Sequence, residues 1–200
     1  MLHQFQTKAH DLPGLFQDVQ LMSTLMKNIE KQAVLDPTHY EPNDYRGDAF
    51  EFFVELFLSL HSADNRVGVY DYVPIKRHED RGADGRGINI RKEKCVVQIK
   101  YRNNTSSMLS ANEDHLSNLM TAGMLLGVSF DMEDPKNFRH FVFTTAKSLH
   151  FYTDEQMFEG KVKCFGIENF RSMVDNNLVF WDKCREIVQH IISTEKAKTL

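Results

Sequence analysis

The segment that decides the fold is Cys95-Val96-Val97-Gln98-Ile99-Lys100-Tyr101, an apolar run that contains one amide and one ammonium group. Its β-branched residues predict a strand, and side chains two apart on a strand point to the same face. Gln98 and Lys100 therefore project together, while Ile99 faces the core. A polar pair inside such a strand costs free energy unless it is hydrogen-bonded or used. The strand is thus both a core element and a candidate site.

Upstream lies Gly82-Ala83-Asp84-Gly85-Arg86-Gly87, with three glycines in six residues. This composition predicts a tight turn at which Asp84 is presented. The intervening Arg91-Lys92-Glu93-Lys94 is expected to form an exposed turn. If the segments around Asp84 and Gln98 pair, a carboxylate, an amide and an ammonium converge near the end of the sheet. Such a set can hold Mg²⁺ through oxygen atoms and place a cation beside an attacking water.

Helical and extended patterns alternate on both sides of these two segments. The apolar spacing predicts helices over 14–34, 47–61, 111–126, 167–175 and 179–195. Further strands are expected over 67–73, 139–145 and 161–165. Residues 36–44 are expected to form a loop, and Ser110 or Asn112 to cap the third helix. Strands separated by helices predict an α/β fold with a central mixed β-sheet flanked by helices.

The composition predicts one globular domain over residues 1–200, with a core of about 47–165 and helical flanks at 1–46 and 166–200. No apolar run approaches the ~20 residues that span a bilayer, and no secretory signal precedes the first helix. We therefore expect an intracellular, cytoplasmic protein without a membrane partner. The three cysteines, Cys95, Cys164 and Cys184, form no Cys-x-x-Cys and are expected to be reduced thiols.

Charge is distributed unevenly along the chain. Residues 76–102 carry nine Lys or Arg and four acids, a local charge of +5, against a net charge of −4 for the whole chain. The net charge argues against a general polyanion binder, whereas the local bias predicts anion binding confined to one face. Arg86, Arg91, Lys92 and Lys94 are candidates for phosphate contacts, with a solvated turn as the alternative.

Three motifs in order resemble the PD-(D/E)xK nuclease superfamily, specifically its Mrr-type branch with Gln in place of the acid. They are Phe50-Glu51 on the expected 47–61 helix, the Gly-rich turn ending in Asp84, and Gln98-Ile99-Lys100 on the apolar strand. The later helix and the 141–145 strand fall where that family's core continues, so that the similarity covers about 50–145. The resemblance implies a restriction-endonuclease-like core with extra N- and C-terminal helices.

The resemblance also implies a role for each residue of the site. Asp84 would be the principal metal carboxylate, with Gln98 and the Ile99 carbonyl as further ligands. Lys100 would orient the nucleophilic water and stabilise charge on the phosphate. Glu51, chosen over Glu55 because Phe50-Glu51 matches the family, would reach the metal directly or through water. Mg²⁺ suits an oxygen-only site, and Mn²⁺ is expected to substitute for it.

Contacts to DNA are expected from residues beside these motifs: Arg81, Arg86, Tyr101, Arg102, Thr144 and Thr145. The sequence and the resemblance together predict a magnesium-dependent DNA endonuclease that acts on double-stranded DNA. A homodimer is expected, because cutting both strands at once requires two active sites. The chain lacks the His-x-x-x-His of a zincin and the phosphate-binding loop of a nucleotide hydrolase.

Several alternatives stay open at this point. The chain could be a stand-alone restriction or homing endonuclease of a bacterium or virus-infected host, or a nuclease module fused to or associated with a phage or viral helicase. It could also be a repair or recombination nuclease. A protein of another class, a non-catalytic DNA-binding or assembly protein on the same fold, is the main rival, and RNA is a possible substrate.

Overall fold

The computed structural model describes residues 12–35, 41–75, 82–111, 116–128, 138–153 and 161–198. The chain divides into two compact units, one formed by Met1–Phe52 with Asn169–Leu200 and the other by Phe53–Glu168. The boundary falls inside the long helix α4, Pro42–Leu60. Each unit is described by itself.

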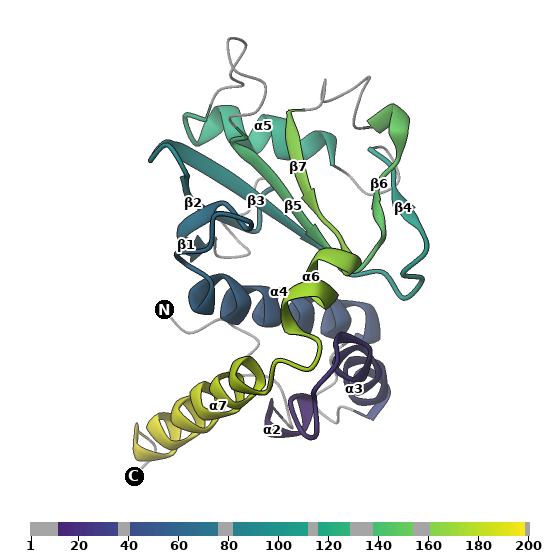
Figure 1. Ribbon diagram of the computed structural model, residues 1–200, viewed down its shortest axis with the longest axis vertical. Coiled ribbons are helices and arrows are strands. Elements are labelled where there is room, and N and C mark those ends of the chain that lie inside the picture. Colours follow the sequence, from purple (N-terminus) through teal and green to yellow (C-terminus); the bar gives the residue numbers. More distant parts are fainter. Residues whose placement is uncertain are drawn as a thin grey trace. The chain divides into compact units, whose positions relative to one another are not determined.

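A five-stranded sheet forms the centre of the Phe53–Glu168 unit (Figure 1). Its strands, in spatial order, are β1 (Val69–Pro74), β2 (Gly85–Asn89), β3 (Lys94–Lys100), β5 (His140–Thr144) and β7 (Val162–Phe165). The first three are antiparallel to one another, whereas β3, β5 and β7 are parallel. The predicted α/β fold with a mixed central sheet flanked by helices is therefore confirmed.

Helices cover both faces of this sheet. On one face, Val96 and Val142 pack with Leu119 and Ala122 of α5, which spans Ser117–Leu125. On the other face, the ring of Phe57 from the second half of α4 lies 5.4 Å from that of Phe165, measured between centroids. Every residue of β5 is buried, as its uninterrupted apolar run predicted.

A second, two-stranded parallel sheet was not predicted. It pairs β4 (Met108–Leu109) with β6 (Ser148–Leu149), which follow β3 and β5 along the chain. Strands of two residues are too short to show a periodic pattern, so the sequence carries no signal for them. Leu109 and Leu149 nevertheless belong to the same buried cluster as Val96, on the α5 face of the large sheet.

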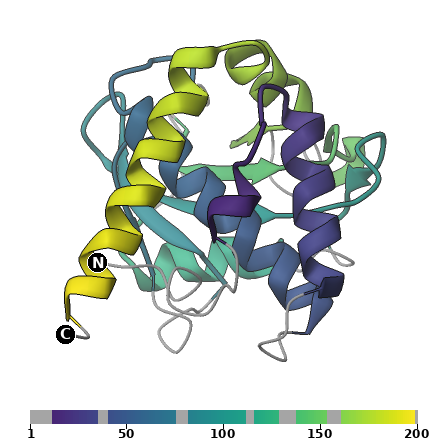
Figure 2. The same ribbon diagram turned by 90° about the horizontal axis from the view of Figure 1, so that it is seen from below.

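The other unit is helical. It contains α2 (Leu12–Leu15), α3 (Met22–Leu35), most of α6 (Ile167–Val174) and α7 (Leu178–Lys198). In Figure 2, α2 lies beside the long α7 helix, drawn in yellow. The guanidinium of Arg185 on α7 donates a hydrogen bond to the carbonyl of Val19 at 3.1 Å, and the indole of Trp181 donates one to Val174 at 2.7 Å.

The predicted helix over 14–34 is confirmed only over α3 and is wrong in its first part, because the chain breaks between α2 and α3. Asp18 adopts a positive φ of 54°, and the carboxylate of Asp175 accepts a hydrogen bond from the backbone N–H of Met22 at 2.7 Å. Val19 is buried in the connection between the two helices. The apolar spacing therefore predicted one continuous helix where the chain forms two.

Two other helix starts also differ from the expectation. α4 begins at Pro42 rather than near residue 47. A proline is tolerated at the first position of a helix, because the N–H there has no partner inside the helix. Of the expected loop over 36–44, residues 36–40 lie outside the described residues. α5 begins at Ser117 after Leu116, which makes no side-chain cap; Ser110 precedes the helix and Asn112 lies outside the described residues.

The Gly-rich segment leads directly into a strand and does not form the tight turn that its glycines predicted. β2 already begins at Gly85, and Gly82 has a positive φ of 101°. The reversal between β2 and β3 comes later, where Lys92 has a φ of 62° and is exposed together with Arg91, as expected for that turn.

No helix within the described residues is long and apolar enough to cross a membrane.

Candidate functional site

Asp84 sits where the ends of β1 and β2 meet the middle of β3. Its backbone N–H donates to the carbonyl of Val97 at 2.9 Å, and its own carbonyl accepts from the N–H of Ile75 at 2.9 Å. The next residue, Gly85, lies against the ring of Tyr72, and a Cβ added there would come within 2.1 Å of that ring. The backbone of Asp84 is therefore held on both sides and admits only glycine after it.

The carboxylate of Asp84 is aimed at β3 by two hydrogen bonds. Its Oδ2 accepts from the side-chain Nε2 of Gln98 at 2.8 Å and from the backbone N–H of Ile99 at 2.5 Å. Gly85, the first residue of β2, pairs with Val97, so that Ile99 lies beyond the end of β2. The N–H of Ile99 therefore donates to the Asp84 carboxylate instead of to a backbone carbonyl of β2. The carbonyl of Ile99 faces the same edge, because both groups of a strand residue point to one side.

Lys100 shares a strand face with Gln98, as the period of two predicted. Its side chain is half-buried, and its carbonyl accepts hydrogen bonds from the hydroxyl of Thr144 at 2.7 Å and the N–H of Thr145 at 3.3 Å. Within the described part of the chain, the ammonium of Lys100 has no hydrogen-bond or ion-pair partner. It is therefore available to an anion beside Asp84.

Thr144 and Thr145, expected to contact DNA, are fully buried and serve another purpose. The Thr145 hydroxyl donates to the carbonyl of Arg102 at 2.8 Å and accepts from the N–H of Arg102 at 2.6 Å. Thr144 binds the carbonyl of Lys100. Both hydroxyls are used within the protein, so the predicted contact is corrected: these threonines position the main chain around Lys100.

The other predicted DNA contacts differ in accessibility. Arg86 is exposed, whereas Tyr101 is buried and cannot present its ring to a ligand. Arg102 is half-buried, and its guanidinium donates to the carbonyl of Tyr101 at 2.6 Å. Burial lowers the pKa of Arg102. Arg81 lies outside the described residues.

The structure brings Asp84, Gln98, Ile99 and Lys100 together in one unit. Glu51 is half-buried on α4 and belongs to the other compact unit. Glu55, one helical turn later, lies in the same unit as Asp84. One of its carboxylate oxygens is inaccessible to solvent, so that Glu55 is not the surface charge that was expected.

The turn between β2 and β3 is ordered by a buried asparagine. The Asn89 Oδ1 accepts hydrogen bonds from the N–H groups of Arg91 and Glu93, at 2.9 and 3.0 Å, and its Nδ2 donates to the carbonyl of Phe138. Glu93 also pairs with Arg139 at 2.7 Å. This scaffold holds an exposed, positively charged turn in a defined shape. No feature of the sequence pattern had identified Asn89 as its organiser.

The donor atoms around Asp84 suit a hard cation with retained waters. Among the described residues, no three His, Cys, Asp or Glu side chains gather into a metal-binding group. Asp84 instead contacts the amide side chain of Gln98 and the peptide of Ile99, which present N–H groups to its Oδ2 and each also carry an oxygen atom. Mg²⁺ is commonly held by one or two carboxylates, with water and substrate oxygens completing its coordination. The set fits Mg²⁺ and is unsuited to zinc, which prefers nitrogen and sulfur ligands.

The cysteines take no part in this site. All three are free thiols, as expected, with Cys95 and Cys184 buried and Cys164 half-buried. Burial raises the pKa of Cys95 and of Cys184 to about 12, so that neither forms a thiolate near neutral pH. Neither thiol is therefore a ready nucleophile near neutral pH.

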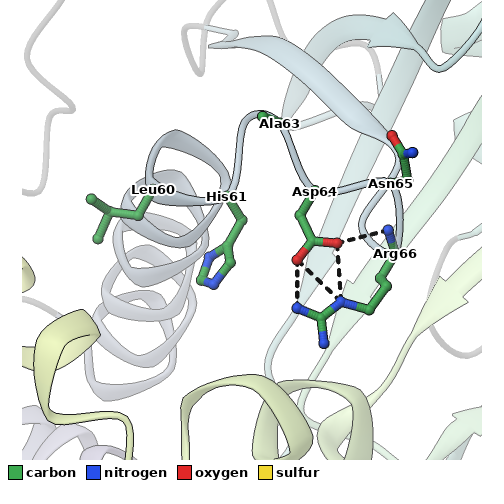
Figure 3. A pocket seen from close by; sticks show the side chains of 6 residues that line it. All are labelled: Leu60, His61, Ala63, Asp64, Asn65 and Arg66. Atoms are coloured by element: carbon green, nitrogen blue, oxygen red, sulfur yellow. Dashed lines mark hydrogen bonds and ion pairs between the residues drawn. The ribbon is translucent and has the colours of Figure 1, made fainter.

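An open hollow of about 550 Å³ lies at the end of α4, away from Asp84 (Figure 3). It is lined by Leu60, His61, Ala63, Asp64, Asn65 and Arg66. The guanidinium of Arg66 binds both carboxylate oxygens of Asp64, at 2.6 to 3.1 Å, which lowers the pKa of Asp64 to about 2. These two charges satisfy each other, and the hollow contains none of the predicted site residues.

Comparison with known proteins identifies no relative, since no family model, curated sequence or solved structure matches this chain. The α/β architecture with a mixed sheet is shown by the structure itself. The resemblance to PD-(D/E)xK nucleases is an expectation from three sequence motifs, and no comparison tests it.

Proposed function

We propose that this chain is a metal-dependent endonuclease that hydrolyses phosphodiester bonds in DNA. The observation that carries the proposal is the contact of the Asp84 carboxylate with Gln98 and with the peptide of Ile99, beside an ammonium on the same strand face. A half-exposed carboxylate near an amide and an ammonium can hold Mg²⁺ and place a cation beside an attacking water, which supports the proposal.

In the proposed mechanism, Mg²⁺ bound by Asp84, the Gln98 amide oxygen and the Ile99 carbonyl would neutralise charge on the scissile phosphate. The chain's own groups then position the reactants. Lys100 orients the attacking water and stabilises the negative charge that develops on the phosphate oxygens. Thr144 fixes the backbone of Lys100 through its carbonyl, so that the ammonium starts from a defined main-chain position.

The register of the sheet places three cations on one face. Arg86 pairs with Val96 and Lys94 with Ile88, and opposed residues in an antiparallel pair share a face. Arg86 and Lys94, both exposed, therefore lie on the same face of the sheet as Lys100. Val96 and Gln98, which lie between Lys94 and Lys100 on this face, are buried, and Val96 packs against α5, so that the cations lie on either side of the covered part of the face.

Wider assignments follow from the same proposal. Action on both strands of a duplex would require a homodimer or a second binding event. A stand-alone restriction or homing enzyme, a helicase-linked module and a repair nuclease all use the same phosphodiester chemistry, so the proposal covers each.

The test is cleavage of supercoiled plasmid with Mg²⁺, Mn²⁺ or EDTA by the wild type, Asp84→Asn and Lys100→Met. Both substitutions approximate the shape of the original side chain. Matched controls are Asp71→Asn on the exposed side of β1 and Lys183→Ala on α7, both exposed and outside the cluster.

We expect metal-dependent nicking that falls by at least 100-fold in Asp84→Asn and Lys100→Met and is unchanged in the controls. Cleavage that survives both site substitutions would contradict the assignment of the site. A folded wild type that binds plasmid and never cuts it would instead favour the non-catalytic DNA-binding protein.

A further inference from the structure

Two exposed aromatic side chains follow β6 in the Phe53–Glu168 unit. Phe151 is 64% exposed and Tyr152 is 60% exposed. All other phenylalanines and tyrosines in the described ranges are buried or half-buried. Leaving two adjacent rings in water forgoes the stabilisation that their burial would provide. Clustered exposed apolar groups of this kind mark binding surfaces.

Hydrogen bonds hold the backbone beneath these rings. The N–H of His150 donates to the carbonyl of Leu109 at 2.8 Å, and the N–H of Thr153 donates to the carbonyl of His150 at 2.9 Å. The buried hydroxyl of Thr153 accepts from the N–H of Ala111 at 3.0 Å. Both ends of the 150–153 segment are thus tied to the chain around β4, and the rings are presented on an ordered backbone.

Three consecutive rings form a surface that we call the aromatic platform: His150, Phe151 and Tyr152. The rings of His150 and Tyr152 are nearly parallel, with an interplanar angle of 15° and centroids 5.6 Å apart. Phe151 meets Tyr152 edge-on, at 72° and 5.8 Å. Preordered aromatic faces bind nucleobases by stacking without regard to sequence, because every base has a π-face.

The described segments that lead to the platform contain basic residues. The described segments 100–111 and 144–153 contain Lys100, Arg102 and Lys147 and no Asp or Glu; the acids that come next in the sequence lie outside the described residues. Lys147 is exposed. Cations that attract phosphate beside aromatic faces that stack bases are the combination used by single-strand-binding surfaces. An apolar protein partner would gain nothing from the cations.

Along the chain, the platform follows the strand ends at which Lys100 lies. Lys100 and Thr144 pair at the ends of β3 and β5, and the connections to β4 and β6 both begin there. Tyr152 is eight residues beyond Thr144, so that even an extended chain would separate them by at most about 29 Å. Figure 1 shows β4 and β6 beside β7, on the same unit as the Asp84 cluster.

We propose that the aromatic platform binds unpaired bases of a DNA strand whose backbone reaches the Asp84 site. This inference rests on the proposed nuclease function and specifies its substrate class: single-stranded DNA, or duplex DNA with an unpaired segment. It differs from the fully paired duplex that the sequence resemblance led us to expect.

The test measures binding of fluorescein-labelled oligo(dT) and of a hairpin duplex of equal length, in EDTA so that cleavage is not required. The F151L/Y152L variant keeps apolar side chains and removes the stacking faces, whereas F151W/Y152W keeps them. L178A/V179A, on exposed residues of α7, is the matched control. We expect F151L/Y152L to weaken oligo(dT) binding at least tenfold with duplex binding unchanged, and the other two variants to bind like the wild type.

A spectroscopic measurement reports stacking directly. Trp181 is the chain's single tryptophan and is buried. The Y152W variant therefore adds an exposed indole, whose fluorescence we expect oligo(dT) to quench. A quenching equal to that of the wild type would overturn the stacking proposal.

The remaining outcomes separate the platform from the nuclease. Undiminished oligo(dT) binding by F151L/Y152L, or none by the wild type, overturns the platform while leaving metal-dependent plasmid cleavage as an independent result. Platform-dependent binding without any cleavage supports the platform as a binding site and overturns the nuclease. A dimer that F151L/Y152L dissociates, measured by sedimentation, would show a self-association surface and overturn the proposal.

Discussion

Replacement of Asp84 by alanine or by asparagine separates its structural role from its chemical role. In the wild type its Oδ2 accepts hydrogen bonds from the buried Gln98 amide and from the N–H of Ile99. Gln98 is only 3% exposed, so that water replaces the lost acceptor poorly. Alanine leaves both donors without this partner, whereas the carbonyl oxygen of asparagine can still accept from them.

The magnitude follows from those two bonds. A buried donor that loses its acceptor costs about 1–3 kcal/mol, so the loss of two acceptors in Asp84→Ala should lower the free energy of unfolding by about 2–6 kcal/mol. For a chain of this size that corresponds to a fall in Tm of roughly 4–24 °C. Asp84→Asn should lower the free energy of unfolding by about 1 kcal/mol, because asparagine lacks the charge but keeps a carbonyl oxygen that accepts hydrogen bonds. Both variants should lose metal-dependent cleavage.

The assay is urea unfolding followed by far-ultraviolet circular dichroism, with plasmid cleavage measured on the same preparations. Asp71→Asn serves as the control, because its side chain is exposed on β1. An Asp84→Ala variant within about 0.5 kcal/mol of the wild type would refute the claim that the carboxylate organises β3. An Asp84→Asn variant that still cuts would refute its role as a metal ligand.

Three further predictions concern pH, packing and the second carboxylate. Burial lowers the pKa of His140 from 6.5 to about 4, so that between these pH values the unfolded state binds a proton that the folded state does not. The free energy of unfolding should therefore fall by about 3 kcal/mol as the pH drops from 6.5 through 4. In urea unfolding measured over a pH series, His140→Gln should remove most of this fall. Gly85→Ala should lower the free energy of unfolding by about 1–3 kcal/mol, measured by thermal unfolding, because the added Cβ would lie 2.1 Å from the ring of Tyr72. Gly47→Ala is the control: its Cβ would have no atom within 4 Å, so the substitution should be neutral or stabilising. If the carboxylate that assists the metal lies on the Asp84 unit, Glu55→Gln should reduce Mg²⁺-dependent cleavage at least tenfold and Glu51→Gln should not; the reverse result would restore the assignment made from the family motif.

Local periodicity was enough to predict the centre of the fold. Val96, Gln98 and Lys100 alternate with buried apolar residues, and the fixed geometry of an extended chain puts them on one face whatever surrounds them. The exposed turn at Lys92 and the fully buried β5 also follow from local pattern alone. The proximity of Asp84 to Gln98 was predicted only on the condition that their segments pair, which the hairpin of β2 and β3 supplies.

Features that depend on distant segments were beyond such patterns. The break before Met22 depends on a carboxylate more than 150 residues away, and the buried hydroxyl of Thr145 is used by Arg102, 43 residues earlier. A threonine or an aromatic residue has the same local pattern whether it faces a ligand, a partner strand or water. The sequence by itself therefore determined β3, β5 and the common face of the polar pair, because covalent geometry sets their period. Tertiary packing alone decided that Thr145 is buried and Tyr152 exposed, because burial depends on which distant segments come to cover a side chain.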